Sequence, residues 1–168
     1  ISNLYINRTT DNIGLFGYNK GSIKGLNLID YNITGSSSVG GVVGYNDYGN
    51  INEVIVSGII NSTSSYSGGV VGYNSYGNVN NVIVKNIENN QSAYRAGGIV
   101  GQAFYGSITG IVENGSITSN DGAGRITGYD LSASIKAYGF DNVSVSQNSS
   151  VNTGEDGTEI NTSNKSLN

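Results

Sequence analysis

Apolar residues recur along the chain in two short patterns that alternate over most of its length. The first pattern has apolar residues at positions one, four and six, as in Ile51, Val54 and Val56. The second is an apolar pair flanked by glycine, as in Gly40–Gly44, which reads GGVVG. Positions four and six share one face of a strand, because side chains alternate with a period of two. We therefore expect two strands per unit, with a bend or bulge just after position one.

The two patterns belong to a repeat of about 28 residues. The segments Gly40–Val56 (GGVVGYNDYGNINEVIV) and Gly68–Val84 (GGVVGYNSYGNVNNVIV) are identical at 14 of 17 positions. The last glycine of the core recurs at steps of 27, 28, 29 and 27 residues, at Gly17, Gly44, Gly72, Gly101 and Gly128. An apolar residue that opens the next segment keeps this period, at Ile23, Ile51, Val79, Ile108 and Ile135. Such a period is typical of solenoids and is too short for a propeller blade of ~40–50 residues.

The repeat predicts an all-β fold, a parallel β-helix or β-solenoid of about five to six coils. A unit of this length cannot bury its apolar face alone, so successive coils must stack and cover one another. Equivalent side chains then lie over one another along one axis, Val54 on Val82. We assign residues 1–148 to the solenoid and the polar residues 149–168 to a C-terminal cap or a linker.

One unit departs from the regular pattern. The first unit is expected to keep the pattern as Ile1, Leu4 and Ile6, and the partial last unit as Ile135, Tyr138 and Phe140. In the fifth unit Ile108 and Ile111 fit, but Glu113 takes the third place. A carboxylate in a dry core is costly, so we expect a local shift of register there rather than a functional opening.

Glycines at fixed places mark the core of each repeat. They are Gly14, Gly17, Gly41, Gly44, Gly69, Gly72, Gly98, Gly101 and Gly128. Recurring glycine indicates either a positive φ or a second backbone that passes too close for a Cβ. The two apolar residues between the glycines are expected to split, one inward and one outward or into a space between layers. The last copy contains Arg125 and Thr127, as suits a terminal repeat that caps the stack.

Tyrosine and asparagine follow each core. We expect Tyr18, Tyr45, Tyr73 and Tyr129 to form one stack that Gln102 interrupts, and a second stack of Tyr48, Tyr76 and Tyr105. Asparagines at equivalent places are expected to bond along the stack from coil to coil. The variable stretches Gly35–Val39, Asn61–Ser67, Asn89–Ala96 and Ser119–Ala123 are predicted as surface loops, where insertions are tolerated.

The composition excludes several classes of function but does not identify one. The chain has 168 residues, 26 glycines, a net charge of −4, and no Cys, His or Pro. Without His or Cys, catalytic triads, thiol nucleophiles and ordinary zinc sites are excluded. Calcium needs several converging oxygen ligands, and the densest candidates, Asp121 with Asn120 and Glu155 with Asp156, carry no recognised loop pattern, so we expect no metal and no cofactor. The eight Lys and Arg residues are scattered, which argues against nucleic acid as a partner. No apolar run reaches the ~18–20 residues that span a bilayer. Because the chain begins within a repeat and without Met, we expect it to be a piece of a longer protein.

The repeated core resembles a known bacterial family. The segments GLFG (Gly14–Gly17), GVVG, GVVG and GIVG, within GGVVGYN…GNINEVIVSG, are similar to the GLUG motif repeats of bacterial surface and secreted proteins. Such repeats occur in streptococcal IgA1-specific metallopeptidases and in adhesin-like proteins, and the similarity covers about residues 1–145. It implies an extracellular, non-catalytic β-solenoid segment. It brings no peptidase activity, because the HExxH zinc helix is absent.

Three functions remain open at this stage. The first is a stalk or spacer that adjoins other domains of the same polypeptide. The second is an adhesin module that binds a host glycan or surface protein, and its ligand contacts are predicted at Tyr66, Tyr94 and Arg95, which lie in the variable loops. The third is a polysaccharide-active enzyme with paired carboxylates, which the scattered acidic residues disfavour. Solvated surface charge and tyrosine that shields the edge of the stack are the simpler interpretations.

Overall fold

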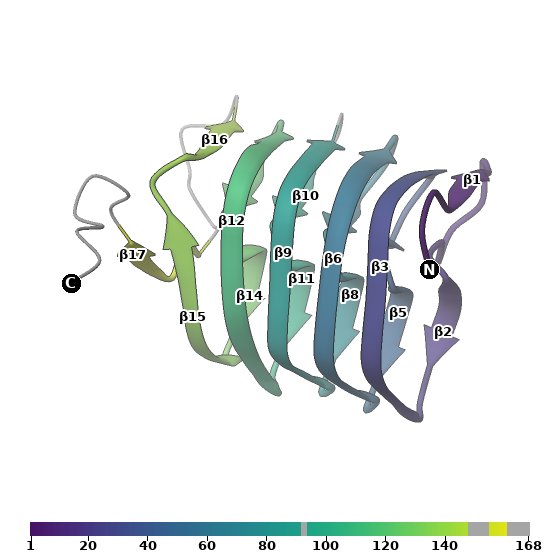
Figure 1. The fold of residues 1–168 in the computed structure, drawn as a ribbon, viewed down its shortest axis with the longest axis horizontal. Helices are drawn as coiled ribbons and strands as arrows, with labels where there is room; N and C mark the ends of the chain where they lie inside the picture. The colour runs from purple at the N-terminus through teal and green to yellow at the C-terminus, as the bar shows by residue number, and fades with distance from the viewer. Residues whose placement is uncertain (92–93, 148–154, 161–168) are drawn as a thin grey trace.

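Each repeat forms one coil of a parallel β-solenoid of about five turns (Figure 1). The structure is a computed structural model that describes residues 1–91, 94–147 and 155–160. The described residues form strands, turns and bends without a helix, which confirms the predicted fold class. Every pair of named strands is parallel, because each coil adds to the one before it in the same direction.

The coils contribute to three sheets. The long sheet contains β1 (Tyr5–Asn7), β3 (Ser22–Gly35), β6 (Asn50–Ser62), β9 (Asn78–Gln91), β12 (Ser107–Ser119), β15 (Ser134–Phe140), β16 (Val143–Gln147) and β17 (Thr158–Ile160). A short sheet contains β4 (Val39–Gly40), β7 (Tyr66–Gly68), β10 (Arg95–Gly97) and β13 (Gly122–Gly124). The third sheet contains β2 (Phe16–Asn19), β5 (Val43–Asp47), β8 (Val71–Ser75), β11 (Val100–Phe104) and β14 (Thr127–Leu131).

The core is a column of stacked aliphatic side chains. Val54 pairs with Val82 and Val56 with Val84 in exact register, and all four are at most 1% exposed. The opening residues Ile51, Val79 and Ile108 also stack in register and are buried. The 28-residue period therefore places like on like, as expected.

Each long strand bends where the backbone turns left-handed. The first bend follows position one, at Gly25, Glu53 and Asn81, with φ between 53° and 68°. This confirms the expected bulge and explains how residues at spacing one and four both reach the core. A second bend lies at Asp30 (φ 55°) and Asn86 (φ 47°), so the long sheet folds around two sides of the core.

The alignment of the first unit differs from the expectation. Ile1, Leu4 and Ile6 do not stack on the opening of β3; instead Ile6 lies opposite Ile33, in the second half of the strand. The second half carries the same spacing of apolar residues, and Asn3 has the same left-handed conformation as Asp30. The expected alignment was wrong because one spacing fits both halves.

The fifth unit shifts register, as expected, and the shift has a simple cause. Ile108 pairs with Val79, and Gly110 pairs with Val82. Two steps along β12 therefore match three steps along β9, so β12 is one residue shorter here. Val112 is therefore the buried residue, whereas Ile111 is only half-buried and Glu113 faces Lys85 at 3.9 Å. The last unit inherits the shift: Phe140 is buried, but Tyr138 is 47% exposed, so its expected inward position was wrong.

The glycine core forms a sharp corner between the two shorter sheets. Two consecutive amides, of Val42 and Val43, both donate to the carbonyl of Val70, at 3.0 Å each. Because successive amides point the same way, the strand alternation is broken, and both valines are fully buried. Of the two arrangements expected for this pair, the one with an outward residue was wrong.

The core glycines serve close approach rather than positive φ. A Cβ on Gly41, Gly69 or Gly98 would lie 2.0–2.3 Å from a carbonyl oxygen of the next coil. The last glycines of the cores, such as Gly72, would meet the backbone of the preceding coil, at 2.3 Å from Ser38. No side chain fits at such distances.

Residues 155–160 continue the stack at its C-terminal edge. The carbonyl of Glu155 accepts from the amides of Ile126 and Thr127, at 2.9 and 3.1 Å, and β17 pairs with β15. Arg125 binds Glu159 at 3.0 Å and lies 3.8 Å from Asp156. Of the predicted cap or linker, residues 149–154 and 161–168 lie outside the described part, as does residue 148 of the predicted solenoid.

Candidate functional site

The three residues predicted to contact a ligand do not occupy equivalent environments. Tyr66 and Arg95 are half-buried neighbours in adjacent coils. The Arg95 Nη1 donates to Gln102 Oε1 at 2.7 Å, and its guanidinium lies 3.8 Å from the centre of the Tyr129 ring. Tyr66 packs on Tyr73, at 5.6 Å between ring centres. Tyr94 alone is well exposed, at 55%. Arg95 thus packs on Tyr129 beside Gln102, whereas Phe104 joins Tyr73 to Tyr129, with ring centres 5.7 and 6.4 Å apart.

Both predicted tyrosine stacks exist. Tyr18, Tyr45 and Tyr73 follow one another with ring centres 5.1 and 5.0 Å apart. The second stack, Tyr48, Tyr76 and Tyr105, has nearly parallel rings at 5.1 and 4.9 Å, and its members are 41–65% exposed. All three residues of the second stack are left-handed, with φ of 54–56°. They therefore form an exposed aromatic edge at the turn that leads into the long sheet.

Asparagine ladders connect the coils next to these tyrosines. Asn19 Nδ2 donates to Asn46 Oδ1 at 2.8 Å, and Asn46 Nδ2 donates to Asn74 Oδ1 at 2.7 Å. Asn46 and Asn74 are completely buried, and each also donates to the backbone carbonyl of a glycine in its own turn. The ladder ends at Ala103, which takes the next place. These amides satisfy each other and are not available to a ligand.

The acidic side chains near this edge are paired on the surface. The Tyr18 hydroxyl donates to Asp47 Oδ2, and Lys20 lies 3.2 Å from the same oxygen. The hydrogen bond from Tyr18 lowers the pKa of Asp47 below its usual value, and the bond to Asp47 raises the pKa of Tyr18. Among the described residues, no three acidic side chains gather closely enough to hold a metal ion.

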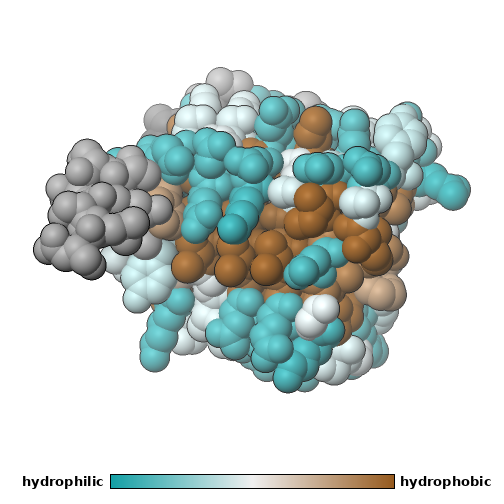
Figure 2. Space-filling model, viewed as in Figure 1, coloured by the Kyte–Doolittle hydropathy of each residue, from teal (hydrophilic) through white to brown (hydrophobic). Residues whose placement is uncertain are grey.

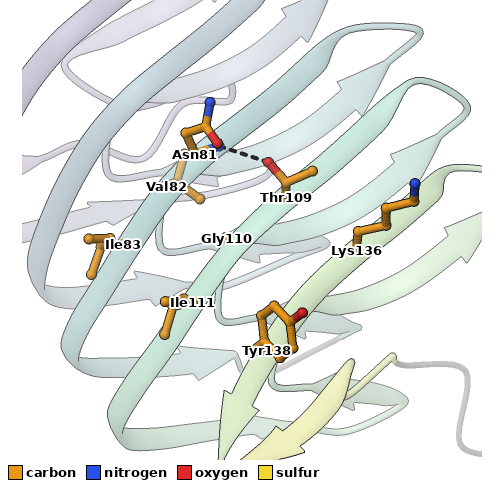
Figure 3. Close-up of a pocket in the computed structure, with 8 residues that line it drawn as sticks. All are labelled: Asn81, Val82, Ile83, Thr109, Gly110, Ile111, Lys136 and Tyr138. Atoms are coloured by element: carbon orange, nitrogen blue, oxygen red, sulfur yellow. Dashed lines mark hydrogen bonds between the residues drawn. The ribbon is translucent and has the colours of Figure 1, made fainter.

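The outer face of the long sheet carries a shallow groove of about 380 Å³ (Figure 3). It is lined from β9, β12 and β15 by Asn81, Val82, Ile83, Thr109, Gly110, Ile111, Lys136 and Tyr138. The shift of register creates it: β12 lacks the residue that bends β9 at Asn81, and Gly110 supplies no side chain. Val82 and Gly110 therefore form a floor between polar groups at one end and apolar side chains at the other.

An apolar row adjoins this groove. Ile55, Ile83 and Ile111 are register partners on adjacent strands, and each is half-buried. Figure 2 shows the corresponding hydrophobic band across this face, with hydrophilic side chains on both sides of it. Tyr138 continues the row on β15.

Polar groups line the neighbouring hollow. Asn52, Asn80, Asn81, Ser107, Thr109, Ser134 and Lys136 surround it. A third hollow lies between β15 and the last described residues, and its lining includes Lys136, Tyr138 and Glu155. Lys136 thus borders all three depressions. The sequence patterns placed Tyr138 in the core and did not single out Lys136; the signal that would have pointed to both as groove residues is the one-residue shortening between Ile108 and Val112.

In comparisons with known proteins, no family model, no curated relative and no solved structure matches this chain. Within the described residues there is also no helix of sufficient length and apolar character to cross a membrane.

Proposed function

We propose that this chain is a non-catalytic structural segment, a stalk or spacer of the GLUG-repeat type in a bacterial surface or secreted protein. The observation that carries the proposal is the continuous parallel pairing of neighbouring strands in the long sheet from β1 to β17. Side-chain ladders reinforce it on the inside, through Asn19, Asn46 and Asn74. A stack held together by hydrogen bonds along its whole axis resists bending and fixes the distance between its ends.

The distribution of chemical groups supports a non-catalytic role. The chain has no His and no Cys. Its described acids are spread over different coils, and several of them form ion pairs with Lys20, Lys24 and Lys85. A carbohydrate-active site of the usual kind needs two carboxylates about 5–9.5 Å apart on either side of a bound sugar, and an ion-paired surface acid is a poor candidate for either.

A pair of spin labels tests the spacer. Because the chain lacks Cys, cysteines introduced at the exposed positions Asn7 and Ser144 provide unique attachment sites near opposite ends of the stack. Pulsed electron spin resonance is expected to give one narrow distance distribution. A Gly/Ser linker of equal length, labelled at the same spacing, should give a broad one. A broad distribution for the folded protein would refute the rigid spacer.

A binding module is the second candidate, favoured by the groove and by the exposed stack of Tyr48, Tyr76 and Tyr105. Aromatic faces beside amide groups suit a host glycan or a protein surface. The predicted contacts Tyr66 and Arg95 are engaged within the protein, which leaves Tyr94 as the accessible member of that set. A glycan array probed with the purified protein tests this version, and silence across the array would remove it.

A further inference from the structure

Lys136 differs from the other described lysines in its electrostatic surroundings. Lys20, Lys24 and Lys85 pair with Asp47, Glu53 and Glu113, at 3.2, 3.4 and 3.9 Å. Lys136 forms no ion pair with any carboxylate among the described residues. On a chain with a net charge of −4, this ammonium group has no ion pair among the described residues and borders three depressions, so it is available to an external anion.

The neighbours of Lys136 provide complementary contacts. Lys136 and Tyr138 lie two residues apart on β15, so they share the outer face of the strand, and Figure 3 shows both beside the groove. Thr109 is the register partner of Lys136. The Oγ1 of Thr109 accepts a hydrogen bond from the backbone N–H of Asn81 at 2.8 Å. This bond leaves the hydroxyl proton of Thr109 free to donate to a ligand. Ile111, the partner of Tyr138, continues the apolar side.

This combination matches a sugar ring that carries a carboxylate. One face of a pyranose is apolar and stacks on a tyrosine ring, while its hydroxyls bond to amide and hydroxyl groups. A carboxylate at one edge would pair with an ammonium group through charge-assisted hydrogen bonds. We propose that the groove over Gly110 binds an acidic monosaccharide unit, with its carboxylate on Lys136 and its ring against Tyr138 and Ile111.

The surrounding charges define which anions fit. Glu155 lines the hollow on the other side of Lys136, and Glu113 lies one strand away from it, paired with Lys85. A polyanion such as nucleic acid or a heavily sulfated chain would meet these carboxylates, whereas a single carboxylate at Lys136 avoids them. An open site with one charge pair and one aromatic contact predicts weak affinity, with a dissociation constant of about 1 mM, equivalent to about 4 kcal/mol.

Nuclear magnetic resonance titration of the intact ¹⁵N-labelled protein tests the site. The probes are methyl β-glucuronide, methyl α-sialoside, methyl β-glucoside and acetate. Both acidic sugars are sources of the same chemistry, and the two titrations show which of them the groove prefers. We expect saturable shifts at residues 109–111 and 136–138 with at least one acidic sugar, and about tenfold weaker binding of the neutral glucoside.

Variants separate the two contacts. Lys136→Gln should remove the preference for the acidic sugar over the glucoside, and Tyr138→Ser should weaken both sugars. The matched control Lys24→Gln removes an ion-paired lysine of β3, away from the groove, and should leave the titration unchanged. Circular dichroism of each variant verifies that the solenoid is intact.

Three results would overturn the proposal: no shifts up to about 20 mM sugar, well above the expected dissociation constant; equal shifts with acetate alone; or equal losses in Lys24→Gln and Lys136→Gln. The site does not rest on the spacer function. A protein that fails this titration but keeps a narrow spin-label distribution remains a spacer, and one that binds sugar with a broad distribution is a binding module only.

Discussion

Single side chains in this solenoid are selected by the coil above and the coil below. Asn46 is the clearest example, because it is fully buried and bonds to Asn19, Asn74 and the carbonyl of Gly49. An isolated asparagine in this core would be costly, since a buried amide without partners loses its hydration. The ladder makes the same residue favourable when it recurs at the same position.

Replacement of Asn46 by alanine should therefore be strongly destabilising. It leaves the buried partners Asn19, Asn74 and Gly49 each short of a bond, and the free energy of unfolding is expected to fall by about 3 kcal/mol. Urea denaturation measures the loss. Asn50→Ala provides the matched control, because Asn50 accepts from Asn78 on the exposed face and should cost less than about 1 kcal/mol. Equal losses in the two variants would contradict the importance of the buried ladder.

Gly98 is determined by backbone approach. A Cβ at this position would lie 2.0 Å from the carbonyl oxygen of Arg125, and the coils cannot separate without breaking their ladders. Gly98→Ala should lower the free energy of unfolding by about 3 kcal/mol or more. At Gly21 the nearest atom to an added Cβ is 3.7 Å away, so Gly21→Ala should be tolerated. Thermal melting that shows no difference between the two would disprove the close contact.

The strands owe their shape to the residues at which they bend. β6 and β9 have the same first bend, at Glu53 and Asn81. They therefore keep one register from Asn52 to Ser57, on both sides of the bend. β12 has no left-handed residue at this place, so each later residue of β12 meets its partner in β9 one position earlier in the count from Ile108. A one-residue difference exchanges the inward and outward sides of a strand, which is why Ile111 and Tyr138 face outward.

Tyr31 connects elements that are far apart in the sequence. It lies in β3, is 1% exposed, and donates from its hydroxyl to the carbonyl of Gly69 at 2.8 Å. Its ring occupies space that Gly41 and Gly58 leave open, since a Cβ on either would come within 2.7 Å of Tyr31 atoms. The side chain thus fastens the second bend of the long sheet to the glycine corner.

The burial of Tyr31 predicts a loss of stability at high pH. Burial raises the pKa of the Tyr31 hydroxyl far above its usual value, so the folded protein keeps this proton when the unfolded chain, with a pKa of about 10, releases it. Stability is unaffected below pH 10 and falls above it, by up to about 1.4 kcal/mol per pH unit. Tyr31→Phe should make this slope shallower by that amount and cost about 1 kcal/mol at pH 7. Urea denaturation between pH 7 and 11.5 measures both effects, and identical slopes would contradict them.

The whole molecule behaves as a one-dimensional stack, because each coil contacts mainly its neighbours. β6 and β9 are covered on both sides by full-length strands, whereas β1 is an edge strand and β15 has on its outer side only the three-residue β17. End coils of such stacks lose fewer interactions when they open, so local stability should decrease toward both ends.

Hydrogen exchange followed by mass spectrometry tests this gradient. Amides of β6 and β9 should exchange at least about tenfold more slowly than those of β1 and β15, equivalent to about 1.4 kcal/mol of additional opening free energy. Exchange at one common rate over all coils would indicate all-or-none opening instead. Asn46→Ala should accelerate exchange most in the coils that contain Asn19, Asn46 and Asn74.

Much of the architecture follows directly from the repeated pattern. The period predicts which residues become neighbours, because parallel stacking converts a distance of 28 residues in sequence into one step between strands. The sequence alone therefore predicts the column of Val54 and Val82, both tyrosine stacks and the asparagine ladder. The function is not, since neither the fold class nor the comparisons assign one.

Some features depend on the number of residues between two bends of a strand, and only the tertiary structure determines these features. The spacing of Ile1, Leu4 and Ile6 fits either half of β3, and the choice depends on which half the neighbouring coil offers. The groove at Gly110 and the outward side chain of Tyr138 both arise because β12 has one residue fewer than β9 between Ile108 and Gly110. This difference changes which residues of β12 and of β15 face outward. The unpaired state of Lys136 depends on which carboxylates lie across the sheet from it, and a sequence period carries no information about charges that do not repeat.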